Sequence, residues 1–345
     1  MNQKNIETFN KFTEEALTGK ASAQFEVGVC YFFGFGVNQD ESEAVKWWGK
    51  AANQGHADAQ NNLGEVYRGG LGMLEKDFER AVEWYRKAAT QGHADAQYNL
   101  ANRYYFGEGV PNDPEQTMIW WIKAAEQNHT DAQHNLGVCY AAGDIVVKND
   151  ELAVFWLRKA GEQGNGDSLH NLALSYVNGE GVEQDQEMAF SLYKKAAELG
   201  FSTSQHNLAL CYLNGNGTTK DPAKALYYCE KAALSGNQEA QKIVALLYFN
   251  GIGVSKNLVE SYAYFSLATV PQEALFVPTD YLQRAMEARQ NIKALEKEMS
   301  PEQIEAAKER ADALDSEIQS NVQAIKDNDK MAQRNKMKAG AISGK

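Results

Sequence analysis

Residues 57–92 read ADAQNNLGEVYRGGLGMLEKDFERAVEWYRKAATQG, and the same pattern returns along most of the chain. Its clearest marker is a tyrosine that recurs every 36 or 37 residues, at Tyr31, Tyr67, Tyr104, Tyr140, Tyr176, Tyr212 and Tyr248. A period of this length indicates one supersecondary unit that must stack on copies of itself to bury its apolar face. Stacked units form an extended surface rather than an enclosed pocket, so the pattern favours binding over catalysis.

Each repeat contains two predicted helices. Ala59, Leu63 and Tyr67 lie on one helical stripe, which predicts a first helix, called helix A. Ala81 and Ala88 define the stripe of a second helix, helix B, which is antiparallel to helix A because the connection is short. We expect the recurring tyrosine to be buried in the helix A stripe. The large residues expected to fill the space between neighbouring repeats are Trp47, Trp84, Trp120, Trp156, Tyr228 and Tyr264.

The loop between helices A and B carries paired glycines, which are expected to adopt positive φ and to end helix A. The pairs are Gly34/Gly36, Gly70/Gly72, Gly107/Gly109, Gly179/Gly181, Gly215/Gly217 and Gly251/Gly253. An Asp or Asn then caps helix B, at Asp40, Asp77, Asp113, Asn149, Asp185, Asp221 and Asn257. This G-x-G follows a helix and lacks a Gly-Lys-Ser/Thr, so it does not indicate a nucleotide site. We expect no cofactor.

The full pattern, A-x-A-x-x-x-L-G/A-x-x-Y-x-x-G-x-G-V-x-x-D-x-x-x-A-x-x-W-x-x-K-A-A-x-x-G, resembles the Sel-one-like repeat (SLR), a relative of the tetratricopeptide repeat. The resemblance covers seven repeats, from residue 21 to about residue 269. Repeat 4 departs from it, because Ile145 replaces the second glycine, and repeat 7 departs where YAYFSLATV replaces the K-A-A ending. The resemblance implies an all-α fold, a right-handed α/α superhelical solenoid that scaffolds protein complexes.

Four segments follow from the pattern. They are a capping helix in residues 1–20, the seven repeats in residues 21–269, C-terminal capping helices in residues 270–329, and a basic disordered tail in residues 330–345. The last helix, expected to end near Asp327, has apolar residues at heptad-like spacing. We interpret it as a cap, with a dimerising coiled coil as the alternative. The chain is therefore expected to be a monomer, or a dimer through its C-terminal helices.

The formal net charge of −12 argues against a nucleic-acid partner, because phosphate binding requires clustered lysine and arginine. The four cysteines are interpreted as buried thiols in a reducing compartment. The first residues lack the basic and apolar segments of a secretory signal, and no run of 18 apolar residues occurs. The chain is expected to be cytoplasmic, with any membrane contact made by the basic tail.

Helix A turns one face away from the core, at positions two, five, nine, twelve and thirteen of each repeat; we name this surface the A-face. Position six, at its flank, is Asn62, Asn99, Asn135, Asn171 and Asn207. Position five beside it includes Tyr98, His134, His170 and His206. A column of amides can donate to and accept from an extended peptide backbone. In tetratricopeptide relatives the corresponding groove holds extended peptides, so these nine residues are the candidate peptide-binding site. The alternative is that they bond neighbouring helices and set the superhelical pitch.

Phe25, Phe32, Tyr98 and Tyr105 are expected to add apolar pockets for such a peptide. The glutamines at position four point nearer the core and are interpreted as structural; they are Gln24, Gln60, Gln97, Gln133, Gln205 and Gln241. The aligned histidines lie too far apart to share a metal ion, so no metal site is expected. No catalytic residues are recognised, and the chain is predicted not to be an enzyme. The alternative is a β-lactam-binding or hydrolase-like activity, as in a cysteine-rich secreted branch of the family.

Overall fold

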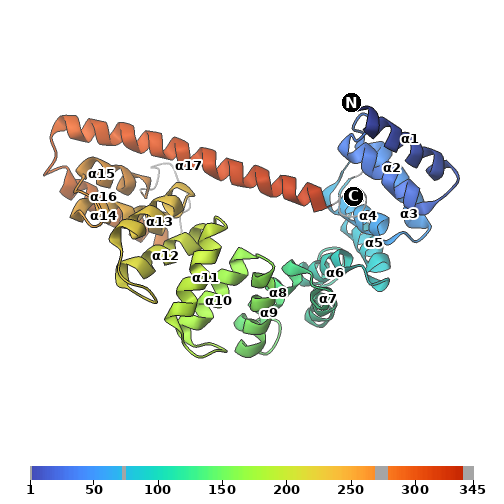
Figure 1. Cartoon of the computed structure of the whole chain (residues 1–345), viewed down its shortest axis with the longest axis horizontal. Helices are drawn as coiled ribbons and strands as arrows, with labels where there is room; N and C mark the ends of the chain where they lie inside the picture. Colours follow the sequence, from blue (N-terminus) through green and yellow to red (C-terminus); the bar gives the residue numbers. More distant parts are fainter. Residues whose placement is uncertain (1, 72–74, 269–278, 337–345) are drawn as a thin grey trace. The chain divides into compact units, whose positions relative to one another are not determined.

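The computed structural model of the chain describes residues 2–71, 75–268 and 279–336. Seventeen helices and no strand occur in these ranges, which confirms the predicted all-α repeat solenoid (Figure 1). The chain begins with α1 (Gln3–Leu17). Seven pairs of helices A and B follow: α2 (Ala21–Phe33) with α3 (Glu41–Asn53), α4 (Ala57–Gly69) with α5 (Phe78–Thr90), α6 (Ala94–Phe106) with α7 (Pro114–Glu126), α8 (Thr130–Ala142) with α9 (Asp150–Glu162), α10 (Gly166–Asn178) with α11 (Gln186–Glu198), α12 (Ser202–Asn214) with α13 (Pro222–Leu234), and α14 (Gln238–Asn250) with α15 (Leu258–Leu267). The helices α16 (Thr279–Leu295) and α17 (Pro301–Lys336) come last.

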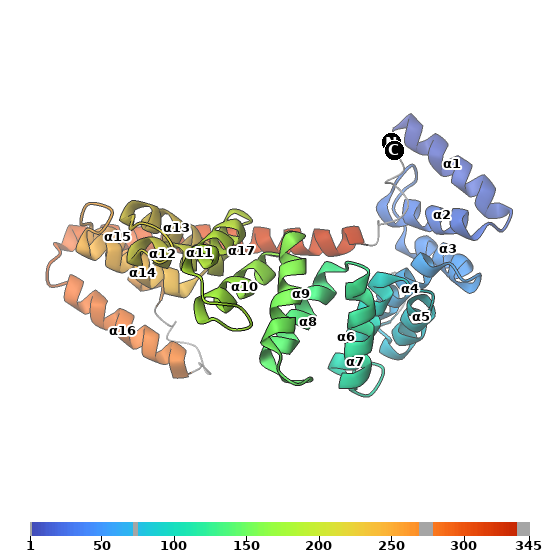
Figure 2. The same ribbon diagram turned by 60° about the horizontal axis from the view of Figure 1, so that its bottom comes forward.

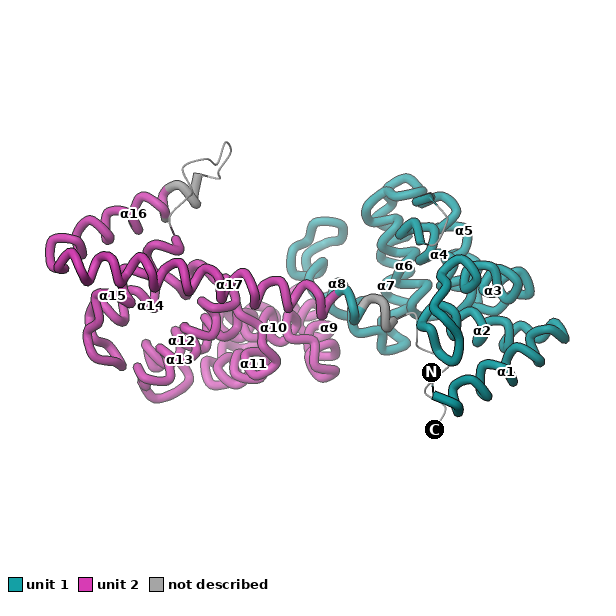
Figure 3. The backbone as a smooth tube through the Cα atoms, turned by 90° about the horizontal axis from the view of Figure 1, so that it is seen from above, with its two compact units in different colours: residues 1–149, 330–345 teal, residues 150–329 magenta. Residues whose placement is uncertain are grey.

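The chain forms two compact units, which Figure 3 shows in different colours. Unit 1 comprises residues 1–149 and 330–345, and unit 2 comprises residues 150–329. The division falls in the connection between helices A and B of repeat 4, the repeat in which Ile145 replaces the second glycine.

The caps and glycines expected from the sequence set the helix ends. Asp40, Asp77 and Asp113 each accept a hydrogen bond from the backbone N–H three residues later, as do the equivalent residues of repeats 5 to 7. The first loop glycine of each repeat has φ between 66° and 79° and ends helix A. Gly72 lies outside the described residues.

The second loop glycine brings neighbouring repeats together. A Cβ at Gly109 would lie 2.3 Å from the carbonyl oxygen of Phe78, at the start of helix B in the preceding repeat. The same clash arises at Gly181, Gly217 and Gly253, so only glycine fits. Ile145 has a side chain at this point, and Val147, two residues further on, is 86% exposed. The loop of repeat 4 therefore lacks the backbone contact that the other second glycines make.

In repeats 1 to 3 the buried aromatic of helix B differs from the prediction, whereas Tyr264 of repeat 7 is buried as predicted. Trp48, Tyr85 and Trp121 fill the space against helix A, whereas Trp47 and Trp84, one residue earlier, are half-buried. The reason is the helical period, since Ala44, Trp48 and Ala52 share one stripe. Gly28 and Gly64 make room: a Cβ there would lie 2.4 Å from Trp48 and Tyr85, respectively. A lysine instead lies over the ring of these half-buried tryptophans. The Lys50 Nζ atom, for example, lies 3.7 Å from the centroid of the Trp47 ring.

Most of the recurring tyrosines are half-buried rather than fully buried as predicted, because their hydroxyl groups reach helix B of the preceding repeat. Arg86 donates a hydrogen bond to the Tyr104 hydroxyl at 3.2 Å, and Arg158 donates to the Tyr176 hydroxyl at 3.1 Å. The Tyr248 hydroxyl donates to Glu230 at 2.7 Å. These tyrosines therefore join neighbouring repeats through both ring and hydroxyl.

Extra helices cover both ends of the repeats. In unit 1, the amide of Gln24 on α2 donates to the carbonyl of Ala16 on α1, so α1 takes the place of a preceding helix B. In unit 2, α16 lies beside α14 and α15, and Lys242 pairs with Glu287 at 2.6 Å (Figure 2). The helix α17 continues beyond the expected end at Asp327, to Lys336. Residues 330–336 are thus helical, not disordered, because no glycine or proline interrupts them. Residues 337–345 lie outside the described residues.

Candidate functional site

The start of helix A is fixed by a side chain that caps it. His56, His93 and His129 each accept a hydrogen bond at Nδ1 from the backbone N–H three residues later. Nε2 therefore carries the proton, and His93 donates it to Asp58 on the preceding helix A at 3.1 Å. His129 lies 3.3 Å from Asp95 in the same arrangement. Each imidazole caps its own helix and ties the A-face of one repeat to the next.

The glutamines at position four are structural, as predicted. Gln60 and Gln97 are buried, and each side-chain amide donates to a backbone carbonyl of the preceding helix B. Gln91 and Gln127 in turn donate to the Gln60 and Gln97 side chains, both at 2.7 Å. We name this arrangement the glutamine clasp. The glutamine clasp thereby fixes helix A of one repeat against helix B of the preceding repeat.

In unit 1 the predicted asparagines differ in their surroundings. Asn62 is only 4% exposed, and its Nδ2 has no hydrogen-bond partner in the described part of the chain. Asn99 is half-buried and donates to the Asn61 side chain at 3.1 Å. Asn135 is half-buried, and its amide makes no hydrogen bond with any described residue. Burial removes Asn62 from the surface, and Asn135 keeps an amide that a ligand can reach.

In unit 2 the predicted asparagines also differ in their surroundings. Asn171 is half-buried, and its side-chain amide makes no hydrogen bond with the described residues. Asn207 lies within hydrogen-bonding reach of the Tyr193 hydroxyl, whose pKa is raised to about 12 chiefly by burial. Asn171 is therefore the counterpart of Asn135, with an amide not used within the fold.

The predicted residues at position five are largely committed to neighbouring repeats. The Tyr98 ring stacks on His129 with centroids 4.5 Å apart. His170 Nδ1 lies 3.0 Å from the Ser204 hydroxyl, whereas His206 Nδ1 is buried without a hydrogen-bond partner among the described residues. Burial lowers the pKa of both His170 and His206. His134 is half-buried.

The phenylalanines predicted to form ligand pockets are part of the core instead. Phe25 and Phe32 are both buried, and Phe25 stacks on His56 with centroids 4.7 Å apart. Position five of repeat 1 faces the next repeat rather than solvent, which explains the error. Beside it, burial and the charge of Asp58 raise the pKa of Glu26 to about 7.

Sequence reasoning placed position nine on the A-face but named no residue there. In repeats 2 and 3 it is polar and accepts from helix B, with Tyr85 donating to Glu65 at 2.6 Å and Trp121 to Asn102 at 3.0 Å. In unit 2 it is apolar: Leu174 and Leu246 are each 38% exposed, and Leu210 lies in the repeat between them. Aligning position nine across the seven repeats would have found this row, since Leu174, Leu210 and Leu246 recur at a constant interval of 36 residues.

Two further searches bear on the kind of site. Within the described ranges, no group of three or more His, Cys, Asp or Glu side chains is placed to hold a metal ion. None of the described helices combines the length and apolar character needed to cross a membrane. The four cysteines are free and buried, and burial raises the pKa of Cys30, Cys139, Cys211 and Cys229.

The comparison with protein families identifies the repeat. The family model described as Sel1 repeat matches seven consecutive segments, residues 21–56, 57–93, 94–129, 130–165, 166–201, 202–237 and 238–269. The matched segments coincide with the helix pairs of the structure, and repeat 4 is matched despite Ile145.

Solved structures agree with this match. A protective antigen present in uropathogenic Escherichia coli strains, described as displaying an SLR fold, is 30% identical; the match covers 94% of this chain and 74% of that one, with a TM-score of 0.56. A Sel1 repeat protein from Oxalobacter formigenes is 32% identical, covering 73% of this chain and 98% of that one, with a TM-score of 0.63. Among curated proteins, 67 residues are 34% identical to the ERAD-associated E3 ubiquitin-protein ligase component HRD3A of Arabidopsis thaliana, which is 19% of this chain and 10% of that relative. The match spans only a tenth of the relative's length.

Proposed function

Because the chain belongs to the Sel1 repeat family, we propose that it is a protein-interaction scaffold whose A-face binds an extended segment of another protein. The family and the repeat solenoid support the scaffold role. The chemistry of the A-face supports the extended segment, because amides not used within the fold and exposed apolar side chains lie on the same helices. The proposed role is binding, and it requires no catalytic residue on the A-face.

The observation that carries this proposal lies in unit 2. Asn171 and Leu174 are three residues apart on α10, and Asn207 and Leu210 have the same spacing on α12. Residues at this spacing are neighbours on a helix surface. An amide and an apolar side chain thus lie side by side on each of these two helices; the Asn171 amide is not used within the fold, whereas Asn207 lies within hydrogen-bonding reach of the Tyr193 hydroxyl. A peptide presents the complementary pair at each residue, a polar backbone and a side chain.

The repeat spacing fits an extended chain. Neighbouring helices pack about 8 to 10 Å apart, and a strand rises about 3.3 Å per residue, so about three peptide residues pass each repeat. We therefore expect the bound segment to place an apolar side chain at about every third residue where it crosses repeats 5 to 7. The acidic body of the chain favours segments that are neutral or basic.

The proposal is tested by selecting ligands from an array of random peptides with the full chain as probe. The selected peptides are then titrated against a double variant, Asn135→Ala with Asn171→Ala. Loss of two peptide hydrogen bonds worth about 1 kcal/mol each is expected to weaken binding by at least about tenfold. Leu174→Glu is expected to weaken the same peptides.

The matched control is Asn53→Ala with Asn216→Ala, since both asparagines are exposed and lie outside the A-face. Far-UV dichroism establishes that each variant stays folded. The proposal is wrong if no peptide binds saturably, or if the selected peptides bind the Asn135/Asn171 variant as tightly as the unchanged protein.

A further inference from the structure

A second depression lies within unit 2, on the side of the repeats opposite the A-face. It is a cavity of about 800 Å³ between α9 and α11, with α10 as its floor. Leu169 and Leu172 form the floor, and Met188, Leu192 and Leu199 line the wall on α11. We name it the outer groove. It shares no residue with the candidate peptide-binding site.

A local departure from the repeat pattern produces the outer groove. Position four of repeat 5 is Leu169, where most other repeats have glutamine. The glutamine clasp is therefore replaced by a leucine that packs on Gly161, where a Cβ would lie 2.9 Å from the Leu169 side chain. Gly161 itself stands where the other K-A-A endings have alanine. The two changes together substitute an apolar, more open junction for a polar, closed one.

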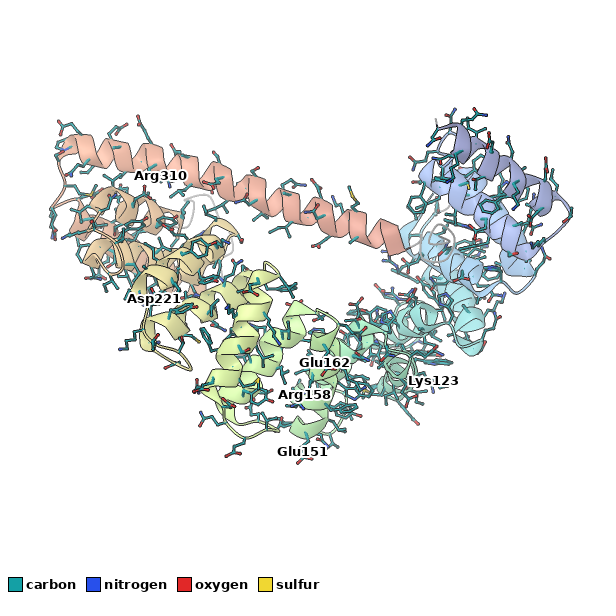
Figure 4. All side chains as sticks on the ribbon, in the orientation of Figure 1. Lys123, Glu151, Arg158, Glu162, Asp221 and Arg310 are labelled. Atoms are coloured by element: carbon teal, nitrogen blue, oxygen red, sulfur yellow. The ribbon has the colours of Figure 1, made fainter. Side chains whose placement is uncertain are left out.

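The rim of the outer groove carries exposed apolar side chains together with charges of both signs. Met188 is 42% exposed and Leu199 is 53% exposed. On α9, Arg158 and Glu162 lie one turn apart, as Figure 4 shows, and α11 carries Lys195 and Glu198 in the same order. Helices B of successive repeats run the same way. Both positive groups therefore lie at one level of the groove, and both negative groups lie about one turn further on.

These charges remain available to a partner. Arg158 donates to the Tyr176 hydroxyl, an uncharged group. For Glu162, Lys195 and Glu198 no ion pair is formed with any residue that the structure describes. Apolar side chains with charges of both signs beside them, of which Glu162, Lys195 and Glu198 are in no ion pair with a described residue, complement the surface of an amphipathic helix.

The walls favour a helix over an extended chain. All three sides are helices whose backbone groups are already bonded to each other, and, unlike the A-face, this lining has no asparagine or glutamine to pair with the N–H and C=O groups of an extended segment. A helix satisfies its own backbone. The dimensions agree: about 800 Å³ spread along a 13-residue helix of about 20 Å gives a cross-section near 40 Å², enough for a row of side chains but not for a whole helix.

We propose that the outer groove is a second interaction site, which binds an amphipathic helix of a partner protein that carries an acidic and a basic residue one turn apart beside its apolar stripe. The acidic residue pairs with Arg158 and Lys195, and the basic residue pairs with Glu162 and Glu198. This site is independent of the peptide-binding role proposed for the A-face. One chain then holds an extended segment and a helix on different surfaces.

Three synthetic helical peptides serve as probes for the full chain, each of about 16 residues so that it forms a helix. All share leucines at i, i+4 and i+7 on an alanine background. The bipolar peptide carries one glutamate and one lysine a turn apart beside this stripe. The acidic peptide has two glutamates at these two positions, and the basic peptide has two lysines there. Binding is measured by fluorescence anisotropy at low salt. We expect the bipolar peptide to bind about fivefold more tightly than either of the others.

Variants assign the binding to the outer groove. Met188→Glu with Leu199→Glu is expected to weaken the bipolar peptide by more than about tenfold, because two exposed apolar contacts become charged. Arg158→Glu with Lys195→Glu makes all four rim charges negative and is expected to shift the preference to the basic peptide. Tyr227→Glu, on an exposed residue of α13, is the matched control. Asn135→Ala with Asn171→Ala should leave these peptides unaffected, which separates this site from the A-face.

The proposal is overturned if none of the three peptides binds saturably, if all three bind equally, or if the Met188/Leu199 variant binds as the unchanged protein does. A shift of preference in the Arg158/Lys195 variant supports it, because a substitution that merely disturbed folding would weaken all three peptides together. Far-UV dichroism of each variant accompanies the titrations.

Discussion

Gln91 donates a hydrogen bond from Nε2 to the Oε1 of Gln60 at 2.7 Å, and Gln60 donates in turn to the carbonyl oxygen of Ala52 at 3.1 Å. The three residues come from the end of α5, from α4 and from α3, so one buried amide joins two repeats. A glutamine is required because only an amide both accepts from one partner and donates to the other. The clasp therefore explains why glutamine, a polar residue, recurs at a buried position.

Replacement of Gln97 by leucine should destabilise unit 1. The variant loses the bonds to Ala89 and Gln127 and leaves the Ala89 carbonyl without its side-chain donor, which we expect to cost about 2 kcal/mol. Repeat 5 shows how a leucine is accommodated, since Leu169 packs on Gly161. Gln97→Leu combined with Ala89→Gly should therefore be less destabilised than the sum of the two single variants. Urea denaturation measures the three midpoints, and strict additivity would contradict the argument.

The repeat period predicted most of the fold because it depends on local chemistry. Positive φ at the loop glycines and aspartate caps on helix B are imposed by the backbone itself. The error over Trp47 and Trp48 shows the limit of pattern reading: both are large and apolar, and a small rotation of helix B decides which one faces helix A. Phe25 is a similar case. Its repeat position predicts the A-face, but the stacked ring of His56 covers it.

The candidate site was predicted less completely, because contacts between repeats decide which amides remain available. Asn62, Asn99 and Asn135 share one position, yet one is buried, one bonds to Asn61 and one has no partner among the described residues. The Asn61 side chain that Asn99 meets lies in the preceding repeat, 38 positions away. A single-repeat alignment does not contain that pairing. The outer groove was missed for the same reason, since it results from Leu169 and Gly161 acting together across a repeat boundary.

Removal of the Tyr85 hydroxyl tests the link between helix B and position nine. Tyr85 is buried and donates to Glu65 at 2.6 Å, and Arg68 donates to the same carboxylate at 2.7 Å. Tyr85→Phe should lower the free energy of unfolding by about 1.5 to 3 kcal/mol, the range for a hydrogen bond to a charged group. The control is Tyr140→Phe, on a half-buried tyrosine whose hydroxyl makes no hydrogen bond with the described residues, which should change stability much less. Equal effects in the two variants would show that the hydroxyl of Tyr85 contributes nothing specific.

The carboxyl of Glu26 should make stability depend on pH. Burial, with a smaller contribution from Asp58, raises the pKa of Glu26 from 4.5 to about 7 in the folded chain. Between these two values the folded state binds more protons than the unfolded state, so this group's contribution to stability falls as pH rises from about 4.5 to about 7. Glu26→Gln should remove that loss and be stabilising above pH 7, with little effect near pH 4.5. Thermal midpoints of both proteins across this pH range check the sign of the stability change. The control is Glu126→Gln, because Glu126 is exposed.

Truncation within α17 separates the capping role of this helix from a role in dimerisation. Ala307, Leu314 and Ile318 are buried, and Arg310 donates to both carboxylate oxygens of Glu260 on α15 at 3.0 and 3.3 Å. From residue 323 to residue 332 every side chain is exposed. A chain ending at residue 329 should therefore keep its free energy of unfolding. A chain ending at residue 300 should lose roughly 3 to 6 kcal/mol of it, because the apolar residues that α17 covers become exposed to solvent. Chemical denaturation measures this, and light scattering measures mass in parallel. A full chain that is dimeric and becomes monomeric on truncation at residue 329, with unchanged stability, would instead assign the exposed half of α17 to an interface.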